Sequence, residues 1–205
     1  EWNRDDSDEE RDLSHLRLRA EEEARALQRC LRERDLQGLE RIKQSGTWGR
    51  KIFRFASEFM IGKRRHYPCG AGRYYVGIGA SGDVYPCHRF VGTESTKLGS
   101  VADGEVDRSE FNETSMAKGV SCADCYAKHV CSGGCYHDNF GKTGDLFDPD
   151  STVCHLIRHV VGLAASLASQ WTHSELAFLS AHELIDPIDC SLDMFSDQVS
   201  EAANS

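Results

Sequence analysis

Long hydrophobic runs are missing from this sequence. No stretch approaches the roughly 18 apolar residues that span a bilayer, and no charged-then-apolar leader opens the chain. Basic residues are also in the minority, since 24 Lys and Arg stand against 33 Asp and Glu, for a formal net charge of -9. Nucleic-acid affinity comes largely from clustered Lys and Arg. We therefore expect a soluble, cytoplasmic protein with neither a nucleic acid nor a membrane as partner.

Cysteine, by contrast, is abundant. Nine are present, and seven of them lie between Cys69 and Cys154. The count is odd and nothing signals export, so disulfides are disfavoured. In a reducing compartment, clustered thiols at short spacings more often bind metal or do redox chemistry. The chain begins with Glu1 rather than Met, and we expect it to be a fragment of a longer gene product.

Amphipathic helices are predicted on both sides of the cysteine-rich segment. One is expected from Trp48 to about Gly62, and an earlier one carries its apolar stripe at Leu13, Leu16, Ala20, Ala24, Leu27 and Leu31. Thr172 and Glu175 predict a capping box for a short helix near the end of the chain. Before it, Asp150 or Ser151 can cap a helix with a buried stripe at Val153, Leu156, Ile157, Val160, Val161, Ala164, Leu167 and Trp171.

The segment between these helices has a different amino-acid composition. Tyr74 to Ile78 and Val84 to Tyr85 predict a short hairpin whose turn uses Gly82. Phe90 to Val120 is polar and irregular, and metal ligation would have to order the residues from Cys122 to Cys154. The expected fold class is α+β: a small loop-rich domain with a short β-hairpin, flanked by α-helices. We expect a helical lead-in over 1–66, the cysteine domain over 67–157, and C-terminal helices with an acidic tail over 158–205.

The cysteine spacing is the feature of the sequence that best indicates a function. The pattern is Cys122-x2-Cys125-x5-Cys131-x3-Cys135, then 18 residues, then Cys154. Such spacing lets several sulfurs converge on one small object, which could be zinc or an iron-sulfur cluster. Upstream, the hairpin would return Cys87 close to Cys69. The glycines beside Cys69 and those between Cys131 and Cys135 remove side-chain bulk where backbone would pass close to inorganic sulfide.

This order of spacings resembles the seven-cysteine signature of the SPASM domain. That domain is the C-terminal extension of many radical S-adenosylmethionine (radical SAM) enzymes that modify ribosomally made peptides. The sequence segments at 67–72, 82–92 and 131–135 look most similar to those of the thioether-forming branch. That branch includes the maturases of quinohemoprotein amine dehydrogenase and of six-cysteine (SCIFF) peptides. The resemblance covers residues 67 to about 157.

The resemblance implies two auxiliary [4Fe-4S] clusters. One would be held by Cys69, Cys87 and Cys135, and the other by Cys122, Cys125, Cys131 and Cys154. One ligand of the first cluster is then missing, and it could come from the substrate peptide or from a resident group such as His66, His88 or Cys30. Cys154 falls in the first turn of a predicted helix, where the positive helix terminus is expected to favour a thiolate or an anionic cluster.

One motif of radical SAM enzymes is absent from this chain. Their S-adenosylmethionine-cleaving cluster needs a Cys-x3-Cys-x2-Cys loop, and here Cys131 and Cys135 have the first spacing but Asp138 stands at the third position. The resemblance therefore implies that the catalytic barrel, and with it S-adenosylmethionine, belongs to a preceding part of the gene product or to a separate chain. Residues 1–66 would then hold the closing helix of that barrel and a connector.

Several other residues have simpler interpretations. Cys30 is expected to pack as a small hydrophobe beside the stripe of the first helix, and Cys190 to be a bystander in the acidic tail. Surface or supporting positions are expected for the histidines near the cysteines, which are His66, His88, His129, His137 and His155. Asp83 is first a turn residue, with substrate contact or proton relay as the alternative. The basic run at 63–65 is a solvated face or a balance for cluster charge.

The expected function is accordingly that of an auxiliary [4Fe-4S] domain in an enzyme that modifies a peptide or protein, through thioether cross-linking. Its clusters would serve electron transfer and substrate binding, and the chain alone would not cleave S-adenosylmethionine. The alternative is a stand-alone zinc or iron-sulfur scaffold that recruits a partner without catalytic turnover.

Overall fold

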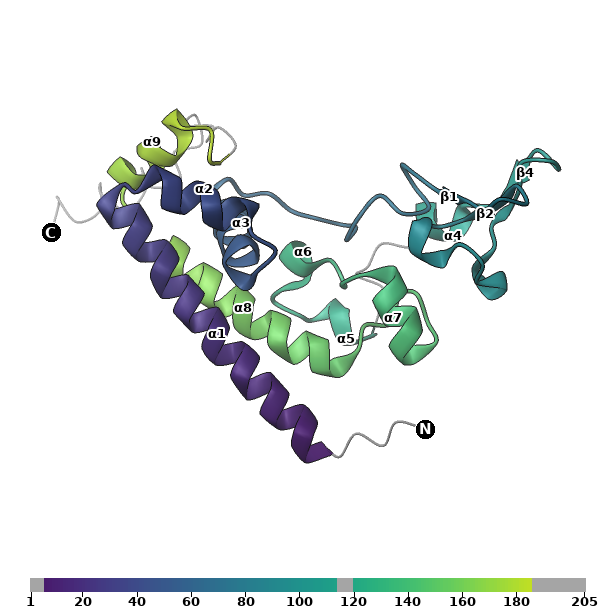
Figure 1. Cartoon of the computed structure of the whole chain (residues 1–205), viewed down its shortest axis with the longest axis horizontal. Helices are drawn as coiled ribbons and strands as arrows, with labels where there is room; N and C mark the ends of the chain where they lie inside the picture. Colours follow the sequence, from purple (N-terminus) through teal and green to yellow (C-terminus); the bar gives the residue numbers. More distant parts are fainter. Residues whose placement is uncertain (1–5, 114–119, 186–205) are drawn as a thin grey trace, which may run out of the picture. The chain divides into compact units, whose positions relative to one another are not determined.

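The computed structural model describes residues 6–113 and 120–185 (Figure 1). It is mostly helical with a small four-stranded antiparallel sheet, which confirms the predicted α+β class. The chain divides into two compact units. Glu1–Leu18 and Lys63–Gly162 form the first, which we call the cysteine-rich unit, and Arg19–Gly62 with Leu163–Ser205 form the second, the helical unit.

The helical unit contains predicted helical segments and one helix that the sequence analysis missed. Helix α1 spans Asp6–Glu33, of which the residues from Arg19 onward belong to this unit, and α3 spans Trp48–Met60, as expected. Between them lies the unexpected α2, Leu36–Gln44. Arg34 adopts a left-handed backbone conformation (φ 55°) that ends α1, and Asp35 then caps α2 by accepting a hydrogen bond from the Gly38 amide at 3.0 Å.

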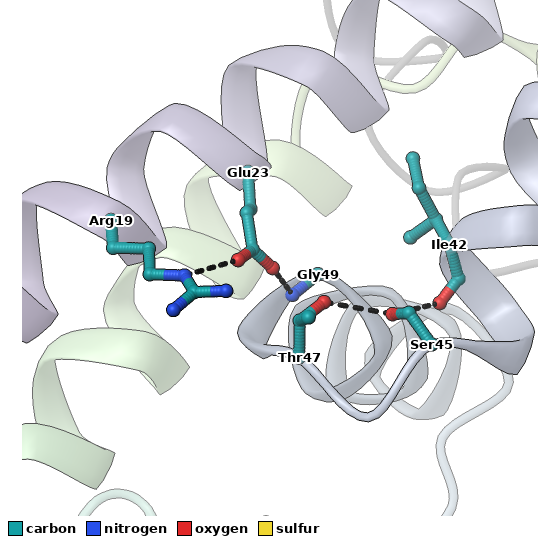
Figure 2. A network of polar contacts seen from close by, with 6 residues as sticks. All are labelled: Arg19, Glu23, Ile42, Ser45, Thr47 and Gly49. Atoms are coloured by element: carbon teal, nitrogen blue, oxygen red, sulfur yellow. Dashed lines mark hydrogen bonds and ion pairs between the residues drawn. The ribbon is translucent and has the colours of Figure 1, made fainter.

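A polar network fixes the start of α3 (Figure 2). The Glu23 carboxylate of α1 accepts a hydrogen bond from the Gly49 amide at 2.5 Å and another from Arg19 at 3.2 Å. Ser45 donates to the Ile42 carbonyl at 2.7 Å and contacts the Thr47 hydroxyl at 2.8 Å. Amides in the first turn of a helix lack partners within the helix, so an acidic side chain stabilises the start of α3.

Apolar side chains of several helices form the core of the helical unit. Phe53 meets Trp171 edge to face, with ring centroids 6.2 Å apart. The short helix α9, His173–Ala181, begins with the predicted capping box, because Glu175 N donates to Thr172 Oγ1 and Thr172 N donates to Glu175 Oε2. Other buried members are Leu27, Leu31, Leu39, Ile52, Phe55, Ala164, Leu167 and Leu179.

The sheet of the cysteine-rich unit has the order β1-β2-β3-β4. Strands β1 (Gly77–Ile78) and β2 (Asp83–Tyr85) form the predicted hairpin, and Gly82 adopts φ +88° in its turn. Strands β3 (Gly99–Ser100) and β4 (Glu105–Val106) correct the expectation of an irregular segment after Phe90. Two-residue strands are too short to show the alternation that identifies a strand in sequence.

Several short helices lie in the remaining part of the cysteine-rich unit. They are η1 (His88–Phe90), η2 (Glu94–Thr96), α4 (Ser109–Glu113), α5 (Val120–Ala123), α6 (Lys128–Cys131) and α7 (Tyr136–Thr143). The long helix α8 covers Ser151–Ala168, and Asp150 caps it by accepting from the Thr152 amide at 2.8 Å. By length and composition α8 could cross a membrane, with mean hydropathy 1.3 and 39% of it buried, and the core helix of a soluble protein passes the same test.

An aromatic cluster that includes Tyr85 of β2 forms a core in the cysteine-rich unit. Phe111 meets Tyr136 edge to face at 5.3 Å, and Phe147 packs against both rings. The buried members of this cluster are Ala71, Tyr85, Cys87, Phe90, Phe111 and Tyr136. They are scattered along the sequence without helical or strand periodicity, so the sequence analysis did not predict a core here.

Candidate metal centres

Four of the seven candidate cysteines line one pocket. They are Cys122, Cys125, Cys131 and Cys154, and we call this place the four-cysteine site. Ala127, Pro149 and Ile157 form the apolar part of its wall. An apolar wall keeps water away from the sulfurs and lowers the local dielectric constant, which strengthens every charge interaction inside.

Short helices bring these cysteines together. Cys122 lies in α5, and the Cys125 amide donates to the Cys122 carbonyl at 3.1 Å in the turn that follows. Cys131 ends α6, with its amide on the Ala127 carbonyl at 2.8 Å. Cys154 comes from the first turn of α8. Three sulfurs therefore come from one compact stretch, and the fourth from a helix that begins 20 residues after Cys131.

Burial and neighbouring cysteines dominate the electrostatics at Cys154. Burial, followed by the charges of Cys122 and Cys131, raises the pKa of the Cys154 thiol to about 11. In the metal-free protein these effects favour the protonated thiol, because desolvation and like charges both disfavour the thiolate. A bound cation would reverse this balance, since thiol ligands must lose their protons to bind a metal.

Arg158 is a functional candidate that the sequence analysis missed. It lines the four-cysteine pocket and its guanidinium donates a hydrogen bond to the Cys125 sulfur. The charge of Arg158 also lowers the pKa of Cys154, against the larger effect of burial. Its spacing could have revealed it, because Arg158 follows Cys154 by four residues and so lies one helical turn further on the same face.

The other three candidate cysteines surround Tyr75, and we call their position the three-cysteine site. The Tyr75 hydroxyl donates a hydrogen bond to the Cys69 sulfur. That bond, partial burial and the nearby charges of Cys69, Cys87 and Cys135 raise the pKa of Tyr75 to about 12. The phenol therefore stays protonated and can serve as a hydrogen-bond donor to sulfur at neutral pH.

Two glycines make room for this arrangement. A Cβ atom on Gly70 would lie 3.0 Å from Cε1 of Tyr75, and one on Gly77 would lie 2.6 Å from the Cys87 carbonyl oxygen. The Tyr75 amide donates to the Gly70 carbonyl at 3.2 Å and holds the ring in place. Bare backbone at both positions lets Tyr75 and Cys87 approach their neighbours closely.

A guanidinium also reaches the three-cysteine site. Arg89 donates to the Cys135 sulfur at 3.4 Å with one nitrogen and pairs with Asp138 at 2.7 Å with the other. Burial acts to raise the pKa of Asp138, but the hydrogen bond and charge of Arg89 outweigh it and the pKa is lowered. The ionised Asp138 therefore fixes the orientation of Arg89.

The loop from Cys131 to Cys135 connects the two sites. Ser132, Gly133 and Gly134 have φ values of 58°, 83° and 83°, so three successive residues are left-handed, a conformation that glycine adopts without strain. The buried Asn139 supports this loop from α7, because its side-chain amide donates to the Gly133 carbonyl at 3.0 Å and to the Leu146 carbonyl at 3.1 Å.

Two buried hydroxyls test whether the sites suit a bound group. The Tyr136 hydroxyl and the Ser132 hydroxyl are buried without a hydrogen-bond partner in the described chain. Burial, and next the charge of Cys69, raise the pKa of Tyr136, which places its hydroxyl close to the three-cysteine site. An unmade buried hydrogen bond costs about 1–3 kcal/mol. Sulfide-rich groups accept hydrogen bonds, so these donors and the soft thiolates together fit an iron-sulfur cluster.

The remaining predicted residues take other positions. Cys30 lies in the helical unit, half-buried and 3.9 Å from Asp35, which agrees with packing on the first helix. His66 meets His129 edge to face with centroids 5.8 Å apart, and His88 is exposed. Asp83 accepts from Ser81 and pairs with Lys97 at 2.5 Å, a partner that the sequence analysis missed. Cys190 lies outside the described residues.

Within the described ranges no three His, Cys, Asp or Glu side chains are grouped closely enough to hold a single metal ion, and the cysteines there form no disulfide. The residues of the four-cysteine site line a pocket. Searches with models of known protein families and against curated proteins find no match to the chain.

Proposed function

We propose that this chain is the auxiliary iron-sulfur part, of the SPASM type, of a radical SAM enzyme that modifies a ribosomally made peptide or protein, by thioether cross-linking. The observation that carries the proposal is the pocket lined by Cys122, Cys125, Cys131 and Cys154, which are the four cysteines assigned to one cluster by the family pattern. The other three assigned cysteines gather around Tyr75, which adds support.

When bound, a [4Fe-4S] cluster would supply a one-electron acceptor at each site. The chain's own part is to hold and tune it. The cysteine sulfurs would ligate iron, Arg158 and Arg89 donate to sulfur, and the apolar wall at Ile157 keeps water out. This sequence has no Cys-x3-Cys-x2-Cys motif. The barrel that cleaves S-adenosylmethionine would therefore lie in a preceding part of the gene product or on a separate chain.

Metal analysis tests this proposal. The full chain, purified without oxygen and reconstituted with iron and sulfide, should be brown and should hold both elements at about the amount of two clusters. Cys125→Ser should lose about one cluster's worth of iron, and Cys30→Ser, the matched control outside the motif, should lose none. A colourless protein that binds zinc and no sulfide would favour the scaffold alternative.

A further inference from the structure

Tyr126 is an exposed aromatic residue whose hydroxyl nevertheless has a defined partner. It is 66% exposed, and its hydroxyl donates a hydrogen bond to the main-chain carbonyl of Arg158 in α8 at 2.7 Å. A main-chain carbonyl oxygen has two lone pairs, so it can accept this bond in addition to one within the helix. Tyr126 directly follows Cys125 in the sequence. Its hydroxyl therefore attaches the turn that carries Cys125 to α8.

Arg158 makes a second contact with the same turn. Its guanidinium donates a hydrogen bond to the Cys125 sulfur. Cys154 stands four residues before Arg158 in α8, so the two side chains leave the same face of the helix one turn apart. Arg158 thus contacts Cys125 through its side chain and Tyr126 through its backbone. We call these two hydrogen bonds the Tyr126–Arg158 clamp.

The clamp joins the two parts of the chain that form the four-cysteine site. Three of the cysteines come from residues 122–131, and Cys154 comes from α8. The residues next to the clamp, Ala127 and Ile157, are buried and line the pocket. The clamp therefore lies where the two parts of the pocket wall meet, and it fixes the first part to the helix that carries the fourth sulfur.

The charge of Arg158 favours the same arrangement. Thiolates that approach one another repel, and the repulsion is stronger in a partly buried pocket than in water. The guanidinium interacts with the charges of both Cys125 and Cys154 and so offsets part of that repulsion. Lys128 also lines the pocket, but its ammonium donates to the Ala123 carbonyl at 2.6 Å, which connects α6 with α5 and not with α8.

We propose that Tyr126 and Arg158 are positioning residues that hold Cys125 and Cys154 together, so that the four-cysteine site retains its bound iron. This inference rests on the proposed function, because it assumes an iron-sulfur cluster at each site. Tyr126 acts through the backbone of α8, and Arg158 acts on the sulfur of Cys125. Loss of either contact lets the turn at Cys125 move away from α8, which exposes the iron of that site to solvent and to chelators.

Iron release from the full, reconstituted chain tests the inference. The chelator 2,2′-bipyridyl removes iron under anaerobic conditions, and samples taken at intervals are reduced with dithionite for electron paramagnetic resonance. This measurement follows the two sites separately. Cys87→Ser and Cys125→Ser assign the two signals, because each removes an expected ligand of one site only.

The variants remove the clamp one bond at a time. Tyr126→Phe deletes a single hydroxyl, and Arg158→Gln removes the charge while the main-chain carbonyl stays. Arg158→Lys keeps the charge and a donor, so it serves as the conservative rescue. Tyr74→Phe, at an 80% exposed tyrosine, and Arg50→Gln, at an exposed arginine of α3, are the matched controls.

The expected result is faster loss of one signal only. Tyr126→Phe and Arg158→Gln should each speed the decay of the four-cysteine signal by about 2- to 10-fold, the factor that one hydrogen bond gives, and leave the three-cysteine signal unchanged. Arg158→Lys should decay more slowly than Arg158→Gln. The double variant should fall short of the product of the two single effects, because both bonds hold the same turn. Loss of the four-cysteine signal already at reconstitution, with the other signal kept, is the extreme form of this result.

Two results would overturn the inference alone. In one, Tyr126→Phe and Arg158→Gln release iron from the four-cysteine site at the rate of the matched controls. In the other, both signals decay faster to the same extent, which would show general destabilisation of the chain. A parent chain that takes up no iron and sulfide overturns the proposed function and this inference with it. Metal content of the parent chain therefore distinguishes the two failures before any variant is compared.

Discussion

Asn139 illustrates how one buried polar side chain can support an irregular loop. It is 5% exposed and donates to the carbonyls of Gly133 and Leu146, which lie on opposite sides of it in the sequence. Both carbonyls belong to irregular backbone that no helix or strand satisfies. The side chain therefore replaces the regular hydrogen bonds that this part of the chain lacks.

Removing that support should weaken the loop between Cys131 and Cys135. We expect Asn139→Ala to lower the free energy of unfolding by about 1–3 kcal/mol, because the buried Gly133 carbonyl and the partly buried Leu146 carbonyl lose their donor. Urea unfolding of the reconstituted chain measures this, and the rate of iron loss to a chelator should rise in parallel. Asn112→Ala, at an exposed position in α4, is the control. Equal stability of the two variants would contradict the role given to Asn139.

Cys30 offers a pH-dependent test in the helical unit. Burial, and next the charge of Asp35, raise the pKa of Cys30 above its usual 9.0. A thiol whose folded pKa is raised contributes stability that is present below pH 9.0 and is lost as the pH rises through the folded value. Asp35→Asn removes the charge but keeps the oxygen that caps α2 by accepting from Gly38.

We expect Asp35→Asn to lower the pKa of Cys30 and so to speed its alkylation by iodoacetamide at pH 9, because the thiolate is the reactive form. Peptide mass spectrometry over time measures the rate. Alkylation of Cys69, which is exposed and lies in the other unit, serves as the internal reference and should not change. If the pH profile of Cys30 alkylation were the same with and without the Asp35 charge, the electrostatic account of Cys30 would be wrong.

At the scale of elements, helix caps are where local sequence and structure agree best. The capping box of α9 is complete, with Thr172 and Glu175 each satisfying an amide of the other. Thr47 also stands at the start of a helix, α3, but its side chain makes no capping hydrogen bond. Two threonines in the same formal position therefore have different roles.

This pair gives a matched test of capping. We expect Thr172→Ala to destabilise α9 by about 1 kcal/mol, because the Glu175 amide loses its acceptor. Thr47→Ala should cost less, since no cap bond is broken there. Hydrogen exchange of the amides in α9 and α3 compares the two. Equal loss of protection at the first turns of both helices would contradict this assignment.

At the scale of the whole molecule, the segments differ in what orders them. The helical unit has periodic apolar stripes, and the cysteine-rich unit has the aromatic cluster around Phe111 and Tyr136. The stretch from Cys122 to Cys135 has only the four-residue helices α5 and α6 before the loop. Under the proposed function, the free energy of metal binding would contribute most to folding there.

Chelation of iron should therefore unfold that stretch first. We expect hydrogen exchange to show loss of protection over Cys122–Cys135 in the metal-free chain, with smaller losses near Phe111 and least in α1 and α3. The free energy of metal binding acts as folding free energy only where other contacts are few. Persistent protection of Cys122–Cys135 without metal would show that the chain orders this stretch by itself.

Several features of this protein follow from local sequence alone. Helical periodicity predicted α1, α3 and α8, and the residues flanking Gly82 predicted the first hairpin. Each of these signals is contained within a few neighbouring residues. Cysteine spacing selected the seven candidate residues in the same way. Helix α2 was missed because it is short and follows α1 after only two residues.

Tertiary structure decided the rest. The aromatic core joins Phe90, Phe111 and Tyr136, which are far apart in the sequence. Tyr75 donates to the sulfur of Cys69, 6 residues away, and Arg89 donates to the sulfur of Cys135, 46 residues away. Such contacts depend on the path of the backbone through turns and left-handed glycines, and no periodic pattern records them. The sequence therefore determined which residues can bind a metal, and the fold determined which charges and hydrogen bonds surround them.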